Sequence, residues 1–453
     1  MPRFINPYNF VSFDESRIAQ QRTQPIVMQH RLDPNRLSGR LRYHLTTLTH
    51  VFTPLYGYGG EEPRSAQGNQ TGEAVVRIFN RLKNDENALP MIQGASLKGV
   101  IRSVAEAVSN SCFTMFSGDY RYRVAGGRWK TVELDETNLP EEMQIDACTL
   151  PSAGETRAGL CICCHLFGTS PTQEDEPAFG GQIAIGDALL MGVDTRRGMT
   201  QVNIQNIAHP DVQRLLFEVR YLQPHTLSNP KPHHDPFYLY NDQIRGRKFY
   251  LHHSQIDDSN LMDVATGQRE VERRHRENRE RQRRGKRPLP LPQPLQLLKP
   301  NAVFGFTVEY RNLTASELGL LCLALQLEDG VCHKIGHGKP IGLGSARIDI
   351  VGVEEVHVAD RWRNLGGGMI HTDDPTQVRE RVKGWTDAFQ ADPVHFYDDG
   401  WEDLKAILRW EPDGPKTWNP HYPTRDWFKD KDNRGRDLPH PRDLQDEGNR
   451  FKE

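Results

Sequence analysis

The sequence predicts an α+β fold, because segments with the two-residue period of strands alternate along one chain with segments of helical period. Strand-like alternation runs over residues 41–51 and 302–310, and an apolar stripe at helical spacing lies within 89–108. Long polar insertions separate these segments. The 453 residues therefore form either two or three units or one core with large insertions.

The first predicted strand is followed by a polar, Gly-rich excursion over residues 56–73, which is too long for a simple turn. The first predicted helix starts after a Gly/Ser turn. Its apolar stripe contains Val100, Val104 and Val108. We expect the inward positions of the strand to share one face: Leu41, Tyr43, Leu45 and Thr47.

The second half repeats the pattern. Residues 180–193 read as strand, and Thr314 and Glu317 form a capping box that opens an apolar helix ending before Gly330. A glycine-rich loop over 334–345 then leads into another strand. With insertions removed, the order β-α-β-β-α-β predicts a ferredoxin-like core.

The predicted units follow from these elements and from two short helical patterns near the end of the chain, at 375–389 and 401–410. They are an N-terminal arm (1–39), a ferredoxin-like core (40–194 and 301–352) with a cysteine-bearing loop at 145–168, an insertion (195–300) and a C-terminal extension (353–453).

Composition narrows the classes of function. The net charge is −3, so contacts with a phosphate backbone must come from local patches. No apolar run reaches the roughly 20 residues that cross a bilayer, and the first residues lack a secretory signal pattern. Seven cysteines in a chain of this size suit a reducing compartment, and we expect a cytoplasmic protein without a membrane partner.

Two glycine-bearing turns are candidate anion sites. The segment GASLKGVIR (residues 94–102) opens a helix, so free backbone N–H groups at Ser96 lie near Lys98 and Arg102 on one face. The segment from Lys334 to Ser345 combines repeated glycines with Lys334, His337 and Lys339. It is neither a P-loop nor a dinucleotide fingerprint. Ordinary capping and a flexible turn are the alternative readings.

Cysteines near the middle of the chain form a candidate zinc site. Cys161 and Cys164 have knuckle spacing, and Cys148 with His165 would complete four ligands. Such a closed site would be structural. The neighbouring Cys163 leaves the ligand assignment open, and unligated buried cysteines remain the alternative.

Three further features give weaker indications of a functional site. Acidic residues in and beside the first excursion, Glu73 and Asp85 among them, could hold a divalent metal such as magnesium. His44 and His50, near the first strand, are candidate acid/base groups. The run over 269–287 interleaves Arg with Glu and lacks aromatic residues, which is typical of a solvated helix or a disordered segment.

Several stretches, in order, resemble the RAMP superfamily of CRISPR-associated proteins, especially backbone-like subunits of type III effector complexes. They are PYNFV (7–11), MIQGASLKGVIRSV (91–104), CCHLFGTS with GGQIAIGDA (163–188), IRGRKFYLHH (244–253) and HKIGHGKPIGLGS (333–345).

The resemblance implies a ferredoxin-like (RRM-like) core with thumb-like insertions, in which Ser96, Lys98 and Arg102 hold guide-RNA phosphates. The fourth stretch adds the basic residues Arg245, Arg247 and Lys248 as RNA contacts. Relatives that cut target RNA use an aspartate in the loop before the helix. Glu73 takes that place here and Asp85 lies further along, which weakens the expectation of an endoribonuclease.

The function that the sequence predicts is a guide-RNA-binding subunit in antiviral defence, with target RNA and other RAMP subunits as partners. Sequence recognition would come from base pairing. One alternative is a metal-independent processing endoribonuclease that uses His44, His50 and His337. Another is a structural adaptor that docks accessory proteins through the insertion.

Overall fold

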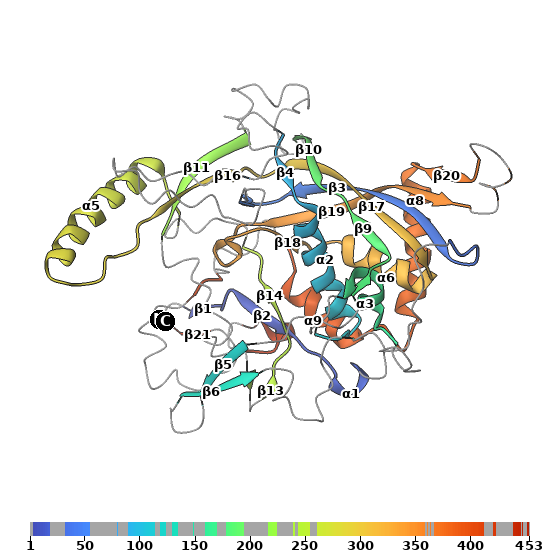
Figure 1. The fold of residues 1–453 in the computed structure, drawn as a ribbon, viewed down its shortest axis with the longest axis horizontal. Helices are drawn as coiled ribbons and strands as arrows, with labels where there is room; N and C mark the ends of the chain where they lie inside the picture. Colours follow the sequence, from blue (N-terminus) through green and yellow to red (C-terminus); the bar gives the residue numbers. More distant parts are fainter. Residues whose placement is uncertain are drawn as a thin grey trace.

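The structure is a computed structural model of the chain, shown as a ribbon in Figure 1. It describes residues 3–18, 32–54, 79, 89–113, 118–123, 129–134, 148, 159–169, 178–193, 216–223, 239–240, 243–253, 261–357, 360, 363, 367–411, 420–422, 438–444, 446 and 451–452.

An antiparallel sheet forms the centre of the molecule. Its four long members lie in the order β19 (Ser345–Val356), β3 (Leu37–Thr47), β17 (Ala302–Leu313) and β10 (Ala188–Val193). The strand that closes the predicted order thus pairs with the strand that opens it. The short β18 (His333–Lys334) and β4 (Met91–Ile92) extend the two ends of the sheet. β9 (Ile183–Ile185) and β20 (Met369–Thr372) pair with β17 and β19.

Two helices cover one face of this sheet, α2 (Gly94–Val108) and α6 (Ala315–Leu325) (Figure 1). Along β3, the side chains of Leu41, Tyr43 and Leu45 are buried in the same core as both helices, whereas those between them are half-exposed. The alternation arises because successive strand residues point to opposite faces. The predicted α+β, ferredoxin-like fold is confirmed.

The helix boundaries follow local chemistry. The capping box of α6 is present, because Thr314 accepts from the N–H of Glu317 and Glu317 accepts in return from the N–H of Thr314. α2 starts at Gly94, where a Cβ atom would lie 2.3 Å from the carbonyl oxygen of Ile185. Only glycine permits this approach of helix to sheet.

The C-terminal part packs on the same core through α8 (Pro375–Gln390) and α9 (Asp398–Ile407), close to both predicted ranges. Gly319 of α6 lies against the backbone of Trp385, and a Cβ there would be 1.9 Å from its carbonyl oxygen. The backbones of α6 and α8 are therefore in direct contact at Gly319, where no side chain fits between them.

The N-terminal segment contains a strand that its sequence did not predict. β2 (Tyr8–Val11) pairs with β14 (Arg247–Tyr250), so two of the stretches that resemble RAMP proteins lie side by side. All four residues of β2 are buried, and a strand of four residues is too short to give a clear periodic signal in the sequence.

An arm extends from the body (Figure 1). Its base is a three-stranded sheet of β15 (Leu261–Met262), β11 (Phe217–Leu222) and β16 (Gln293–Leu298). Its outer part is α5 (Val264–Arg283), so the Arg-rich run forms a helix.

Within the described ranges, no helix has the length and apolar character that a membrane span requires. The remaining elements are short. They are β1 (Arg3–Phe4), α1 (Glu15–Ile18), β5 (Gly118–Arg123), β6 (Trp129–Leu134), α3 (Ile162–Phe167), β7 (Gly168–Thr169), β8 (Phe179–Gly180), β12 (Leu239–Tyr240), β13 (Gln243–Ile244), β21 (Phe451–Lys452) and two 3-10 turns, Lys339–Ile341 and Pro441–Asp443.

Candidate nucleic-acid interface and metal centre

A cavity of about 390 Å³ lies where three separate segments meet. The first turn of α2, strand β14 and the glycine-rich loop after β18 all line it. The cavity thus brings the two glycine-bearing segments together in space.

The cavity has a strongly one-sided charge. Three lysines line it, Lys248, Lys334 and Lys339, and none of its described lining residues is a carboxylate; His333 and His337 add imidazole rings. In a chain with a net charge of −3, this is a local concentration of cations. A wall of this kind attracts a polyanion.

The start of α2 contributes backbone rather than a side-chain cap. Gln93 occupies the N-cap position without a capping hydrogen bond from its side chain, and the exposed Ser96 lies in the first turn beside the cavity. The N–H of Gly94 donates to Asp187 Oδ1 at 2.7 Å. The N–H of Ser96, which the sequence predicts to be free, donates to the carbonyl of Gln93 at 2.9 Å, so both donors are satisfied within the protein.

The glycine-rich loop is shaped by left-handed backbone. Gly336, Gly338 and Gly344 have φ values of 69°, 74° and 84°. The N–H of His337 donates to the carbonyl of Phe52 at 2.9 Å, which anchors the loop to the segment after β3. The exposed His337 and the half-buried Lys339 are thereby held at the cavity.

Lys334 is the most unusual of the cavity cations, because it is only 5% exposed. Its Nζ donates to the carbonyl oxygen of Leu343 at 2.9 Å. Burial, with a smaller contribution from Lys339, lowers the pKa of Lys334 to about 7. Its charge therefore changes near neutral pH.

Two core histidines lie near Lys334, and neither titrates in that range. Burial lowers the pKa of His252 to about 3 and that of His333 to about 4. His252 bonds Ser345 Oγ and the carbonyl of Cys332, both at 2.8 Å, and His333 bonds the carbonyl of Leu325 at 2.9 Å. Both serve as packing and hydrogen-bonding groups.

The two basic residues of strand β14 point to opposite faces of the strand. Lys248 lines the cavity, and its Nζ lies 3.5 Å from the centre of the Tyr8 ring. Arg247 points the other way, into the body, where it lies over the Phe113 ring at 3.9 Å. Alternation along the strand explains the division.

The structure places the other predicted RNA contacts differently. Arg102 donates to Glu106 at 2.8 Å and to the carbonyl of Gly168 at 3.0 Å, so its guanidinium is used within the protein. Arg245 donates to the carbonyl of Leu438 at 3.1 Å. Lys98 is half-buried on α2 and is not among the residues that line the cavity; burial, followed by Arg102, lowers its pKa.

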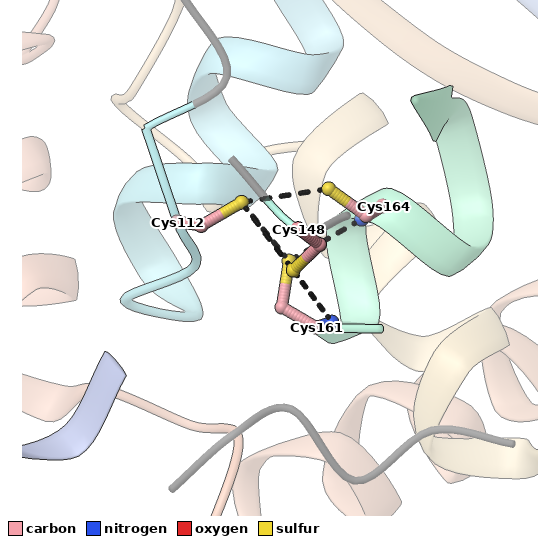
Figure 2. A group of neighbouring side chains, drawn as sticks. All are labelled: Cys112, Cys148, Cys161 and Cys164. Atoms are coloured by element: carbon pink, nitrogen blue, oxygen red, sulfur yellow. Dashed lines mark hydrogen bonds between the residues drawn. The ribbon is translucent and has the colours of Figure 1, made fainter. Parts of the chain in front are cut away.

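Four buried cysteines form a candidate metal centre (Figure 2). Cys112 follows α2, Cys161 and Cys164 belong to the start of α3, and Cys148 comes from a segment between them. The Sγ atom of Cys112 lies 3.6 Å, 3.4 Å and 3.7 Å from those of Cys161, Cys164 and Cys148. A tetrahedral zinc ion with bonds of about 2.3 Å requires sulfur separations of about 3.8 Å.

The surroundings of these thiols suit a metal. Hydrogen bonds with neighbouring thiols, that of Cys112 first, hold the pKa of Cys161 well below its usual range. The N–H of Cys161 donates to Cys148 Sγ at 3.2 Å and that of Cys164 to Cys161 Sγ at 3.4 Å. Backbone donors of this kind stabilise thiolates. The same thiol–thiol hydrogen bonds, that with Cys148 first, hold the pKa of Cys112 well above its usual range, and burial raises the pKa of Cys163, outside the group, to about 12.

The predicted ligand set therefore changes in one member. His165 lies outside the group, and Cys112 takes the fourth place. The ring of His165 is fully buried against the carboxylate of Glu317, the capping residue of α6. The helix α3 turns His165 away from Cys161 and Cys164, because adjacent helix positions point in different directions. Sequence reasoning missed Cys112, which has no knuckle partner of its own.

Of the predicted catalytic residues, the two acidic ones fall outside the described part of the chain, and two of the histidines do not line the cavity. Glu73 and Asp85 lie outside the described residues. His50 Nε2 lies 3.0 Å from Glu218, and His44 is half-buried on β3, where burial lowers its pKa despite the opposing effect of Asp349. These two side chains do not line the cavity that contains His337.

Comparison with known families gives a match over most of the chain. The family model of the RAMP superfamily matches residues 44–347, which include β10, β17, α2, the cysteine group and the glycine-rich loop. The chain belongs to the RAMP superfamily. No curated protein matches it. Membership of the RAMP superfamily indicates a CRISPR-associated, RNA-binding protein that acts within a complex.

Proposed function

We propose that this RAMP protein is a guide-RNA-binding subunit of a type III CRISPR effector complex in antiviral defence, and that it packs beside other RAMP subunits. The observation that carries the proposal is the carboxylate-free cavity where the two glycine-bearing turns meet. Lys248 and Lys339 offer positive charge to phosphates. Such contacts hold a strand without reading its sequence, so target choice falls to base pairing.

The cysteine group supports a structural role for zinc in this subunit. All four ligands come from protein, which leaves no open position for a substrate. The ion would fix Cys148, which is isolated in the chain, to the end of α2 and the start of α3. Cleavage of paired target RNA remains a prediction that rests on Glu73 and Asp85.

The test is RNA binding by single-lysine variants. We expect Lys248→Ala and Lys339→Ala each to weaken binding of two unrelated RNA sequences by the same factor, because phosphate contacts carry no sequence information. Each should also reduce the slope of log K against log salt by about 0.7. Fluorescence anisotropy over a salt series measures both quantities.

The matched control is Lys383→Ala. Lys383 is an exposed lysine of α8 that pairs with Asp387 at 2.5 Å and is not among the cavity residues. Unchanged affinity in both cavity variants would refute the proposal. Cutting of repeat RNA by the isolated protein in the presence of a chelator would favour the processing enzyme instead.

A further inference from the structure

Helix α5 contacts the base of the arm through its first half, where Arg274 donates to Gln223 at 3.3 Å. Gly267 and Val271 are its only buried residues, and a Cβ at Gly267 would lie 2.1 Å from the Tyr221 ring. The rest of α5 leads away from the central sheet at the end of the arm (Figure 1). A helix that buries so little apolar surface gains little from packing, and its shape requires another explanation.

Charges divide sharply along this helix. In the first half, Glu270 accepts from Arg273 and Arg274 at 2.7 Å each, and Arg273 also lies 3.3 Å from Glu277. Residues 263–275 hold three basic and three acidic side chains, without counting His275. This half is therefore a neutral, internally paired helix surface.

The outer half differs. Residues 276–287, which we call the tip, hold seven Lys and Arg side chains but two Glu. Among the described residues, no hydrogen bond or ion pair is made by the side chains of six of these cations, all exposed: Arg276, Arg279, Arg283, Arg284, Lys286 and Arg287.

The tip is also held in shape. The N–H of Leu289 donates to Asn278 Oδ1 at 2.6 Å, the side-chain amide of Asn278 donates to the carbonyl of Leu289 at 2.8 Å, and Arg281 donates to the carbonyl of Arg287 at 2.9 Å. These bonds tie the returning segment to the helix. The cations are thus crowded in a fixed place, where they repel one another until an anion neutralises them.

We infer that the tip binds the phosphate backbone of a nucleic-acid strand. The interaction of the cations in the last turn with the helix dipole explains Arg281 and Arg283 but not the excess beyond them. The tip contains no aromatic side chain and no exposed apolar one until Pro288, so it can neither stack on bases nor wedge between them. It grips by charge.

This inference rests on the proposed function and extends it. The cavity holds phosphates at the body, whereas the tip holds the same or a paired strand further along. It predicts that affinity depends on RNA length. A short strand reaches the cavity alone, and a long strand reaches both surfaces.

The experiment compares the full-length protein with the variant Arg276→Gln/Arg279→Gln/Arg283→Gln/Arg284→Gln, in which glutamine keeps the helix propensity of arginine. Single-stranded RNAs of about 6 and about 30 nucleotides are the probes, because stretches of this order span one and several binding surfaces. We expect the variant to bind the long RNA about tenfold or more weakly with a reduced salt slope, and to bind the short RNA normally.

Two controls sharpen the result. Glu280→Gln should strengthen binding of the long RNA, because it removes an exposed negative charge from the tip. Arg273→Gln, whose charge is already paired, should change little. Circular dichroism verifies that α5 stays helical.

The outcomes separate the two proposals. Unchanged affinity of the four-arginine variant for the long RNA overturns this inference and leaves the cavity proposal intact. The same result is expected if the tip binds an acidic protein instead of RNA. Equal weakening for both lengths also overturns it. If the four-arginine variant binds the long RNA more weakly while Lys248→Ala and Lys339→Ala keep their full RNA affinity, the proposed function is refuted. The inference about the tip is then retained.

Discussion

Arg247 and Glu106 form a buried ion pair of 3.3 Å that joins strand β14 to helix α2. The same guanidinium donates to the backbone carbonyls of Ser111 and Cys112, and Glu106 also accepts from Arg102. This network lies between the cysteine group and the cavity. Lys248 follows Arg247 directly in β14, so the geometry of the metal centre and the position of a cavity lysine share one support.

Metal content should depend on four cysteines and no others. We expect about one zinc per chain by elemental analysis of the native protein, because four ligands within 4.8 Å of one another suit one tetrahedral ion. Cys112→Ser should lose the metal. Cys163→Ser should keep it, although this neighbour is equally buried. Full occupancy in Cys112→Ser would exclude the proposed ligand set.

RNA binding should weaken as pH rises from about 6 to about 8.5, because the pKa of Lys334 is about 7 and phosphate prefers its charged form. Each pH unit above that pKa removes at most about 1.4 kcal/mol of binding free energy. Lys334→Met should flatten the profile. A native profile that is already flat, measured by anisotropy at constant ionic strength, would contradict this role.

The same group predicts the sign of a stability change. Lys334 has a lower pKa in the folded protein than its unfolded value of about 10.4, so the unfolded state binds more protons between these limits. Its contribution to the free energy of unfolding should therefore rise as pH increases from about 7 to about 10. Below pH 7, the buried charge of Lys334 lowers the free energy of unfolding by its full amount. Comparison of urea unfolding of native and Lys334→Met protein isolates the contribution.

The pair of His165 and Glu317 should matter for folding and not for the metal. His165→Ala leaves the buried carboxylate with Arg36, at 3.5 Å, and its capping bond, so we expect a loss of about 1–3 kcal/mol of unfolding free energy. Zinc content should stay at the native level. His371→Ala, which removes a surface contact of 3.7 Å to Glu354, should cost little. Zinc loss in His165→Ala would restore the ligand role.

Glycines of the same backbone conformation provide a test of the cavity loop. At Gly336 (φ 69°), a Cβ would lie 2.4 Å from the carbonyl oxygen of Phe52, whereas at Gly330 (φ 80°) nothing lies within 4 Å. Both Ala substitutions carry the left-handed penalty of about 1 kcal/mol. Gly336→Ala should cost clearly more and weaken RNA binding. Equal effects on thermal unfolding would argue against tight packing of the loop.

The elements with strong periodicity were predictable. The alternation of β3 and β17, the stripe of α2 and the capping box of α6 each reflect local rules, and together they define the order of the core. β2 was missed because a strand of four residues is too short to give a clear periodic signal.

The site was predictable in part. Glycine turns with lysines indicated the cavity, but sequence cannot tell which basic side chains point into the body and which line the cavity. Arg102 and Arg247 look as basic as Lys248 and Lys339, yet the structure uses both inside the protein. Cys112 was missed because its partners come from distant segments, and only folding brings them together.

The pairing of β2 with β14 has a consequence for synthesis on the ribosome. The partner of β2 is made some 240 residues after it, and Asn9 also donates to the carbonyl of Pro439 at 3.0 Å. Contacts between such distant residues slow folding. A chain that terminates before β14 would therefore lack one wall of the cavity.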